Sequence, residues 1–522
     1  MWAVWDVPVS RLSVLRRGTV ITVPAPRSRL LLDTVLDGGS FRSWDSTPAP
    51  VPLISDTPTY RAELAAAHER SGVDEAVVTG EGRIDGRRVA VVCSEFAFLA
   101  GSIGVATAER LIGAIERATA ERLPLLAATA SGGTRMQEGA LAFLRMAAIS
   151  AAVTAHRAAG LAYLVYLRHP TTGGVFASWG SLGHVTVAEP GALVGFLGPK
   201  VYSALHGQAF PDGVQTAENL HRHGLVDAVL PANRLAGVTA RVLAMLDPVD
   251  PMVPPPGPPS RAEPADPDAD AWTSITISRR PERPGVRDLL RLAASDVIPL
   301  AGTGEGEAGT GMLLALVRFG SVACVLIGQD RRAQARSPLG PGALRTARRG
   351  MRLAGELGLP LVSVIDTTGA SLSVEAEEGG LAGEIARCLG DLTELSVPTV
   401  SVLLGQGTGG AALALLPTDR VVAARHGWLT PLPPEGASTI VHGTPDKAAD
   451  VAASQHVRSV DLFRAGAVDT IVDELPDAAD EPEAFTGRVA ATIETELRAL
   501  LPLSPMDRLV RRRRRYRTLG LR

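Results

Sequence analysis

The sequence repeats one order of segments twice, and this duplication restricts the possible fold more than any other feature. In each half, an apolar β-branched strand leads into an amphipathic helix, and a second buried strand then ends in a glycine turn. These strand, helix and strand segments are residues 87–98, 105–121 and 123–130, and then 321–330, 343–358 and 359–366. The turns are Ser131-Gly132-Gly133-Thr134 and Thr367-Thr368-Gly369-Ala370. Strands that alternate with helices imply right-handed βαβ crossovers and buried sheets.

The repetition continues beyond these turns. Each half has a further helix and a further short strand, and each of those strands runs into a Gly-Gly pair. The helices are residues 140–159 and 380–395, the strands are 163–167 and 399–404, and the pairs are Gly173-Gly174 and Gly409-Gly410. As many residues separate Gly133 from Gly173 as separate Gly369 from Gly409. The pattern predicts an α/β protein made by duplication or fusion of one fold.

A segment rich in Pro, Asp and Ala divides the chain nearly in the middle. It runs from Asp247 to about Pro284, and it has too little apolar surface to fold alone. A chain of 522 residues is also too long for one ordinary core. We therefore predict an N-terminal domain over residues 1–246, a linker over 247–284 and a C-terminal domain over 285–522.

Composition excludes several classes of function. A net charge of −3 gives no general attraction to nucleic acid or to acidic membranes, and no uncharged apolar run approaches the length of a membrane span. The first residues lack the pattern of an export signal, and Cys93, Cys324 and Cys388 are scattered, so we expect a reducing cytoplasm and no disulfide framework or four-cysteine zinc site. The only lysines, Lys200 and Lys447, fit neither a biotin-attachment site nor a P-loop. ATP chemistry and cofactor carriage must therefore come from other polypeptides.

The four glycine turns are the candidate sites of chemistry. Strands that end in glycine and start helices place backbone N–H groups at helix N-termini, where these groups have no intrahelical partner. Glycine also lets a substrate oxygen approach closely. The product is an oxyanion hole. A single Gly-Gly pair is usually an ordinary tight turn, but the same pair in register in both halves is much stronger evidence.

Acid–base residues, in contrast, do not form a recognisable catalytic set. The ten histidines show no metal-ligand spacing, and no GxSxG motif is present. His169 and His184 flank the first Gly-Gly segment, and we interpret them as solvated or structural. The acids Glu138, Glu375, Glu377 and Glu378 follow the first turn of each half, and we interpret them as residues favoured at helix starts. Many backbone donors and few acid–base groups suggest enolate chemistry.

Several longer motifs resemble one enzyme family. SEFAFLAGSIG, SGGTRMQEGAL and HPTTGGVFASWGSLGHVTVAEPGALVGFLGPKV resemble the β subunit of the carboxyltransferase of bacterial acetyl-CoA carboxylase. GMRLAGELGLPLVSVIDTTGA, EEGGLAGEIARCL, VPTVSVLLGQGTGGAALAL and PLPPEGASTIV resemble its α subunit. The C-terminal DRLVRRRRRYRTLG is also similar, so we interpret Arg511 to Arg515 as a solvated helix face. The likeness covers roughly residues 30–245 and 285–520, as in a β–α fusion.

The resemblance implies a fold and a reaction. The fold would be two crotonase-like (ClpP/crotonase ββα-spiral) domains in tandem, in an oligomer that is at least a dimer, with a site between halves of different protomers. Acyl-CoA would bind mainly to the N-terminal half. Carboxybiotin, carried on a separate protein, would bind mainly to the C-terminal half, so the implied partners are biotin carboxylase and biotin carboxyl carrier protein. Acetyl-CoA would become malonyl-CoA, through an enolate and two oxyanion holes.

The resemblance also implies which residues form the site. One hole would use backbone groups of Gly173, Gly174 and Val175, and the other those of Gly410, Ala411 and Ala412. Which hole serves which ligand is left open by the sequence. Substrate binding is expected at Ser131, Gly132, Gly133, Arg135, Thr368, Gly369 and Ala370, and carboxybiotin binding at Gly407, Gly409 and Gly410. Arg110, Arg135 and Arg168 are candidates for the CoA phosphates.

The chain departs from the family pattern in four ways. The N-terminal zinc ribbon of many β subunits is missing, so no metal is expected. Thr368 replaces a proline, Gln406 replaces a glutamate, and Ala411 replaces a glycine of the hole. Two alternatives therefore stay open, namely a biotin-independent acyl-CoA decarboxylase or hydrolase of the crotonase superfamily, and a non-catalytic scaffold subunit.

Overall fold

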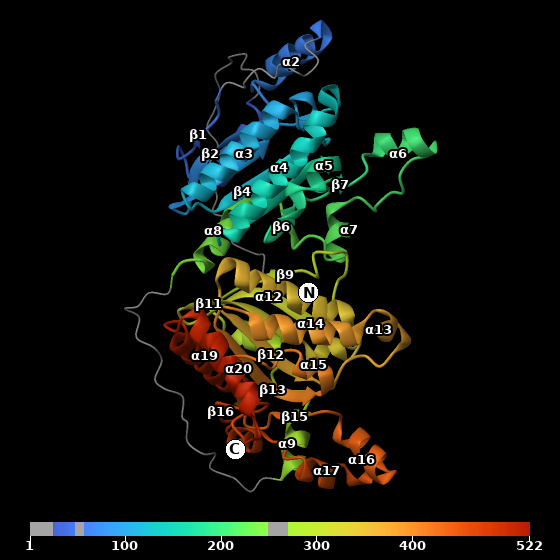
Figure 1. The fold of residues 1–522 in the computed structure, drawn as a ribbon, viewed down its shortest axis with the longest axis vertical. Helices are drawn as coiled ribbons and strands as arrows, with labels where there is room; N and C mark the ends of the chain where they lie inside the picture. Colours follow the sequence, from blue (N-terminus) through green and yellow to red (C-terminus); the bar gives the residue numbers. More distant parts are fainter. Residues whose placement is uncertain (1–24, 47–56, 249–269, 522) are drawn as a thin grey trace. The chain divides into compact units, whose positions relative to one another are not determined.

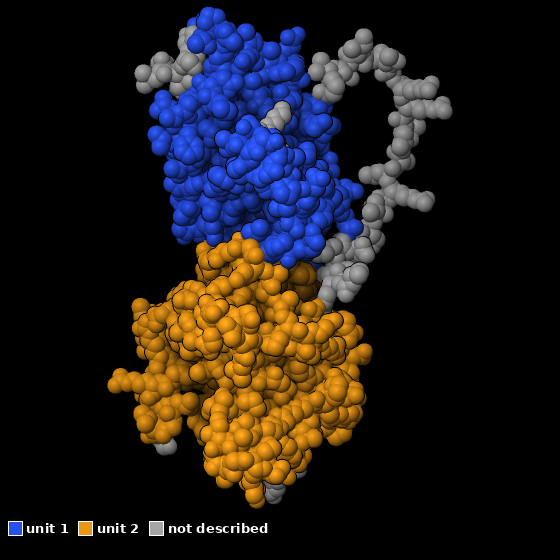
Figure 2. Space-filling view, turned by 90° about the vertical axis from the view of Figure 1, so that its right-hand side faces the viewer, with its two compact units in different colours: residues 1–244 blue, residues 245–522 orange. Residues whose placement is uncertain are grey.

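A computed structural model describes residues 25–46, 57–248 and 270–521 (Figure 1). The chain divides into two compact units, Met1–Ala244 and Met245–Arg522, which Figure 2 distinguishes by colour. Each unit contains one eight-stranded sheet. The predicted α/β class and the duplicated order of elements are thus confirmed. The first residues, on which the expectation about export rests, lie outside the described residues.

Unit 1 is built on a sheet with the order β1-β2-β3-β4-β5-β6-β8, and β7 pairs with β5. From β3 onwards all pairs are parallel, whereas β1, β2 and β3 pair antiparallel. The strands are Arg42–Ser43, Val77–Ile84, Arg87–Ser94, Leu125–Ser131, Tyr163–Thr172, Val185–Ala188, Val194–Gly195 and Ala228–Val229 for β1 to β8. The helices are Arg27–Val35, Pro58–Ser71, Val105–Ala120, Gly139–Ala158, Gly173–Phe176, Pro199–His206, Ala217–Arg222 and Ala232–Met245 for α1 to α8.

Unit 2 repeats this sheet in the order β9-β10-β11-β12-β13-β14-β16, and β15 pairs with β13. Its strands are Asp296–Leu300, Met312–Phe319, Val322–Gln329, Leu361–Thr367, Thr399–Thr408, Arg420–Ala424, Trp428–Thr430 and Thr470–Val472 for β9 to β16. Its helices are Ala271–Ser278, Val286–Ala293, Arg331–Gln334, Pro341–Leu357, Val374–Glu378, Leu381–Glu394 and Gly409–Leu413 for α9 to α15. They continue with Pro434–His442, Ala448–Ser454, Ser459–Arg464, Pro482–Leu500 and Pro505–Thr518 for α16 to α20.

Apolar strands and one face of each long helix form the two cores. In unit 1, α3 and α4 pack against each other over the sheet, and in unit 2 α12 and α14 do the same (Figure 1). All seven residues of β4 and all seven of β12 are buried. Such continuous apolar runs are typical of parallel strands covered on both faces. The last residues of these strands carry the glycine turns, so the cores fix the positions of the turns.

By length and composition alone, one helical segment of the described residues could cross a membrane. It runs from Met136 to Ala158, and 28% of its most apolar window is buried. The segment includes Arg145, and its residues Ile149 and Val153 belong to the core of unit 1. A core helix of a folded unit passes the same test.

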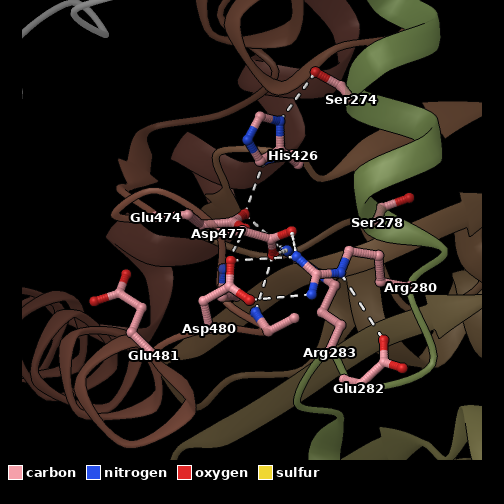
Figure 3. A network of polar contacts seen from close by, with 12 residues as sticks. Ser274, Ser278, Arg280, Glu282, Arg283, His426, Glu474, Asp477, Asp480 and Glu481 are labelled. Carbon is pink, nitrogen blue, oxygen red and sulfur yellow. Dashed lines mark hydrogen bonds and ion pairs between the residues drawn. The ribbon is translucent and has the colours of Figure 1, made fainter.

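The second part of the predicted linker belongs to unit 2, which corrects its predicted end at residue 284. Residues 249–269 lie outside the described residues, but α9 buries Ile275 beside Trp428. Further along, Arg283 donates to Glu474, with 2.6 Å between Nη2 and Oε1, and both side chains are almost fully buried (Figure 3). The segment AWTSITIS is apolar, and Asp270 caps it by accepting from the Thr273 N–H. Because the residues before this helix are rich in Pro and Asp, the composition of the whole segment predicted a linker.

The C-terminal basic run is not a wholly solvated helix face, contrary to the interpretation from sequence. Arg512 is 1% exposed and pairs with Asp419, with 2.8 Å between Nη2 and Oδ2. It also donates to the carbonyls of Leu392 and Leu395 at the end of α14. A guanidinium offers five donors, so one arginine can satisfy both a carboxylate and a helix C-terminus. The composition of the run could not identify these partners, which lie far away in sequence.

Candidate functional site

In unit 1, the two predicted turns lie side by side because they end neighbouring parallel strands. Ser131 at the end of β4 is in register with Thr171 in β5. The first turn uses its own amides, since the Gly132 N–H donates to the Ala100 carbonyl at 2.9 Å and the Gly133 N–H donates to Ser131 Oγ at 3.0 Å. These N–H groups are therefore committed within the protein. The expected substrate-binding role of this turn becomes a supporting one.

The second turn of unit 1 presents the candidate donors. Gly173 begins α5 with a φ of 62°, and its N–H donates to the Phe196 carbonyl at 2.9 Å. A Cβ on Gly173 would lie 3.3 Å from the Gly132 oxygen and from the Gly133 Cα, so the two turns are in backbone contact. Gly174 and Val175 are the second and third residues of α5, and their N–H groups have no partner inside that helix. They are the two candidate donors of unit 1.

A buried ionic network holds the first turn of unit 1. Arg135 is 1% exposed, and it donates to both oxygens of Glu75 at 2.7 and 2.8 Å and to Glu138 at 3.2 Å. Glu138 also accepts from the Tyr60 hydroxyl in α2 and from the Val105 N–H at the start of α3, each at 2.5 Å. The Arg135 guanidinium is therefore committed to two carboxylates. Its expected phosphate-binding role stays a prediction, and the contacts of Glu138 agree with a helix-start role.

In unit 2, the equivalent pair of turns repeats this geometry. The Gly369 N–H donates to Thr367 Oγ1 at 3.1 Å, as the Gly133 N–H does to Ser131. Gly409 begins α15 with a φ of 68°, so Gly410 and Ala411 are the second and third helical residues. Ala412 is the fourth, and the i→i−4 pattern directs its N–H to the Thr408 carbonyl. The candidate donors are thus Gly410 and Ala411, and Ala412 is corrected to a helix-internal donor.

Neutral amides make the direct side-chain contacts with the turns of unit 2, beside an ion pair of Arg331 and Asp366 with 3.6 Å between Nε and Oδ2. Gln334 accepts from the Thr367 hydroxyl at 2.7 Å and donates to the Asp366 carbonyl at 3.1 Å. Gln329 accepts from the Asp366 N–H at 3.1 Å and donates to the Ala411 carbonyl at 2.8 Å. Burial raises the pKa of the Asp366 carboxyl, against the charge of Arg331. Both glutamines are buried.

Each unit therefore presents two adjacent N–H donors at the start of a short helix. Gly174 and Gly410 are both partly exposed, whereas the strands before them are buried. Within the described ranges, no group of three or more His, Cys, Asp or Glu side chains is arranged to hold a metal ion. Paired donors of this kind stabilise negative charge on a carbonyl oxygen.

Comparison with known proteins now assigns the family. Residues 53–508 match the model of the carboxyl transferase domain. The chain belongs to the carboxyl transferase domain family. It is therefore a carboxyltransferase, as its motifs predicted.

Relatives of this carboxyltransferase match it over nearly their whole length. It is 59% identical to the probable biotin-dependent acyl-coenzyme A carboxylase beta3 subunit of Mycobacterium tuberculosis, over 94% of this chain and 98% of the relative. It is also 37% identical to the acetyl-coenzyme A carboxylase carboxyl transferase subunits beta/alpha of Salinispora tropica, over 94% of this chain and 90% of the relative.

Solved structures share the fold of this carboxyltransferase. The transcarboxylase 12S, described as a hexamer assembly, matches with a TM-score of 0.72 and 19% identity, over 92% of this chain and 90% of that one. A single-chain, multi-domain long-chain acyl-CoA carboxylase matches with a TM-score of 0.66 and 18% identity, over 88% of this chain and 45% of that one. The fold is thus the predicted pair of crotonase-like domains.

Other predicted residues of the carboxyltransferase have structural roles. Gly407 is buried in β13, and a Cβ there would lie 2.8 Å from the Trp428 carbonyl oxygen, so packing requires its small size, and its contact with carboxybiotin stays a prediction. Arg110 pairs with Asp74 at 2.8 Å, and Arg168 donates to the Ser94 carbonyl at 3.0 Å. The guanidinium groups expected to hold the CoA phosphates therefore already have protein partners.

The sequence reasoning missed the residues that support the turns. They are Tyr60, Glu75, Gln329 and Gln334. Gln329 was detectable, because a glutamine that ends a fully apolar strand must find hydrogen-bond partners when it is buried. Tyr60 and Glu75 belong to stretches that gave no such indication.

Proposed function

We propose that the protein transfers a carboxyl group from carboxybiotin, carried on a separate protein, to an acyl-CoA. The main support is the duplicated pair of amide donors, Gly174 with Val175 and Gly410 with Ala411, at the same place in two equivalent units. Carboxyl transfer of this kind develops negative charge on two carbonyl-type oxygens. Two separate sets of donors match that need.

Each unit has its own part in the proposed reaction. When the acyl-CoA loses its α-proton, negative charge moves to the thioester oxygen, and Gly174 and Val175 would donate to it. Gly410 and Ala411 would donate to the ureido oxygen. Carboxybiotin would supply the carboxyl group as CO2, which the enolate carbon would attack, and the biotin nitrogen left by the departing CO2 would accept the α-proton. Losing one such donor typically raises the barrier by about 3 kcal/mol.

Acetyl-CoA is the proposed substrate, and malonyl-CoA the product. The Salinispora tropica relative is named for acetyl-coenzyme A, whereas the more similar Mycobacterium relative is named for acyl-coenzyme A in general. The proposed partners are biotin carboxylase and biotin carboxyl carrier protein, and the proposed location is the cytoplasm. We also propose a homo-oligomer, at least a dimer, since the relatives are named as carboxylase subunits.

A second candidate is a decarboxylase that kept the CoA site and lost the use of biotin. Ala411 favours it, because it stands where the family pattern has a glycine and its Cβ is fully buried. Gln406 does not strengthen this alternative. Its amide oxygen accepts from Arg279 Nε at 3.3 Å and its backbone N–H donates to Asp366, so the side chain is well accommodated.

The discriminating assay mixes the purified protein with malonyl-CoA, with and without free biotin or a biotinylated carrier. Transfer that requires biotin supports the main proposal. Loss of CO2 without biotin supports the decarboxylase. No reaction in either condition supports a non-catalytic scaffold subunit. A panel of malonyl-CoA, methylmalonyl-CoA and longer carboxylated acyl-CoAs then tests the choice of acetyl-CoA.

A variant tests the assignment of the unit 1 donors. In Gly174→Val, the added Cβ would lie 3.1 Å from Thr134 Oγ1 and 3.6 Å from the Met146 side chain. Both neighbours are side chains, which can shift to make room, so the fold should tolerate the change. The branched side chain would still crowd the donor pair. We expect kcat to fall about 100-fold or more while the unfolding midpoint changes little. Full activity in this variant would refute the assignment.

A further inference from the structure

Gln329 is the side chain that joins the two turns of unit 2. It is fully buried at the end of β11, where its carbonyl oxygen accepts from the Asp366 N–H near the end of β12. Its amide nitrogen donates to the Ala411 carbonyl in α15. These two contacts also fix which end of the amide is oxygen and which is nitrogen, because the Asp366 N–H can only donate and the Ala411 carbonyl can only accept.

The Ala411 carbonyl depends on this contact. In a continuing α-helix, that oxygen would accept from the Leu415 N–H. Here the Leu415 N–H donates to the Ala412 carbonyl at 3.2 Å, because α15 ends after five residues in a tighter turn. A buried carbonyl without a partner costs free energy, so Gln329 stabilises the helix end. Gln329 therefore holds Ala411 through the Ala411 carbonyl. Ala411 is the third residue of α15, and its N–H is one of the two candidate donors.

Among the described residues of unit 1, no side chain forms an equivalent of this bridge. The corresponding last residue of β3 is Ser94, which pairs with Val77 just as Gln329 pairs with Met312. The Ser94 hydroxyl is buried and makes no hydrogen bond with any described residue. In unit 1 the two turns contact each other directly instead, through Gly133 and Gly173. In unit 2 an added Cβ on Gly369 would be 3.8 Å from Thr408, so these turns leave more room between them.

We propose that Gln329 is a positioning residue for the amide donors of unit 2. It fixes the first turn of α15 relative to the end of β12, and thereby sets the direction of the Gly410 and Ala411 N–H groups. This inference rests on the proposed function, because the donors matter only if they bind a carbonyl-type oxygen. A donor that is misdirected by even a small angle loses much of its effect.

The test compares two matched glutamine variants in the full-length protein. Gln329→Met keeps the length of the side chain but removes both hydrogen bonds, whereas Gln334→Met removes an equally neutral amide that contacts Thr367 and Asp366 and not α15. Gln329→Glu keeps the acceptor for the Asp366 N–H and replaces only the donor to Ala411. Hydrogen–deuterium exchange of the peptide 409–415 is measured for each variant, together with malonyl-CoA-dependent carboxylation of free biotin.

We expect exchange in 409–415 to become about tenfold faster in both Gln329 variants and to stay unchanged in Gln334→Met. We expect kcat for biotin carboxylation to fall about 10- to 100-fold in the Gln329 variants, with an unchanged KM for malonyl-CoA. Unchanged exchange in the Gln329 variants, equal acceleration in Gln334→Met, or faster exchange with full kcat would each overturn the inference. If the wild type carboxylates no biotin, the proposed function fails, while the exchange data still decide whether Gln329 holds α15.

Discussion

Equivalent turns in the two units rest on different chemistry. In unit 1, the turn after β4 is held by buried ions, since Arg135 pairs with Glu75 and Glu138. In unit 2, the turn after β12 is contacted directly by the neutral amides of Gln329 and Gln334, and the Arg331 guanidinium lies 3.6 Å from the Asp366 carboxylate beside it. In both turns the N–H of the last glycine donates to the hydroxyl of the residue that ends the strand, so this contact does not require charged support. The side chains that support the turn could therefore become different in the two units after duplication.

The difference teaches how each turn depends on the rest of its unit. The ionic network reaches α2 through Tyr60 and the start of α3 through Val105, so the unit 1 turn is tied to helices outside the sheet. In unit 2, Gln329 connects neighbouring strands with α15, and Gln334 connects the end of β12 with the short helix α11. Removing one partner of a buried ion pair leaves an uncompensated charge, which costs far more than losing a neutral hydrogen bond. The loss of one supporting side chain should therefore destabilise the turn of unit 1 more than the turn of unit 2.

The largest expected effect comes from removing the central cation of unit 1. Arg135→Met leaves Glu75 and Glu138 buried without a counterion, so unit 1 should lose about 3–5 kcal/mol. The matched change in unit 2, Gln334→Met, should cost unit 2 about 1–2 kcal/mol. Because a two-unit chain need not unfold in one step, urea unfolding is followed by hydrogen exchange in each unit separately. Equal losses in the two units would contradict the comparison.

Backbone contact between the turns gives the next largest effect. Gly173→Ala places a Cβ at a φ of 62° and 3.3 Å from backbone atoms of the first turn, none of which can move aside as a side chain would. We expect a loss of about 1–2 kcal/mol and a fall in kcat of about 100-fold.

The control in unit 2 is Gly409→Ala, at the position that matches Gly173. Its φ of 68° gives the same backbone strain, but the added Cβ would lie 3.4 Å from the Pro431 carbonyl oxygen and would not meet the turn after β12. Its stability loss should stay at about 1 kcal/mol or less. Measuring kcat and the unfolding midpoint of both variants decides the matter, and a more severe effect of Gly409→Ala would show that unit 2 has the tighter pair of turns.

Periodicity and duplication were sufficient to predict the two sheets, their order of elements and the glycine turns. The equal intervals between Gly133 and Gly173 and between Gly369 and Gly409 also aligned the two units correctly. Two details were beyond this reasoning. Whether Ala412 is the third or fourth residue of its helix depends on where α15 starts, which sequence patterns locate only to within a few residues.

The role of Arg135 was missed for a different reason. Its partner Glu75 comes from a segment well before the turn, and Tyr60 from an earlier helix, so no local pattern relates them. A charged residue beside a glycine turn was therefore assigned to the ligand. The long-range partners of a buried polar residue can be identified only from the folded structure. For this reason the sequence predicted the glycine turns but not the side chains that support them.

Acid should weaken unit 1 through a buried histidine. Burial lowers the pKa of His156 from its ordinary 6.5 to about 4. The unfolded chain then binds a proton that the folded unit does not, so stability is complete above about pH 6.5 and falls as the pH drops towards 4. His156→Gln can keep the contact with Thr119 without titrating, and it should flatten this dependence in unit 1 and leave unit 2 unchanged. Urea midpoints between pH 4 and pH 7 would show this, and an unaltered slope would remove His156 as the cause.

The smallest expected effect tests whether the turns of unit 1 are stable without a hydrogen-bonding side chain at the end of β3. The Ser94 hydroxyl is buried and has no hydrogen-bond partner in the part of the chain that the structure describes, so Ser94→Ala removes a polar group that loses its water on folding. We expect the free energy of unfolding to stay within about 0.5 kcal/mol of the wild type, or to rise slightly, with unchanged kcat. The same strand position in unit 2 is Gln329, where substitution should slow catalysis. A loss above about 1 kcal/mol in Ser94→Ala would mean that this hydroxyl holds a partner in solution, and the contrast between a bridged and an unbridged pair of turns would then be lost.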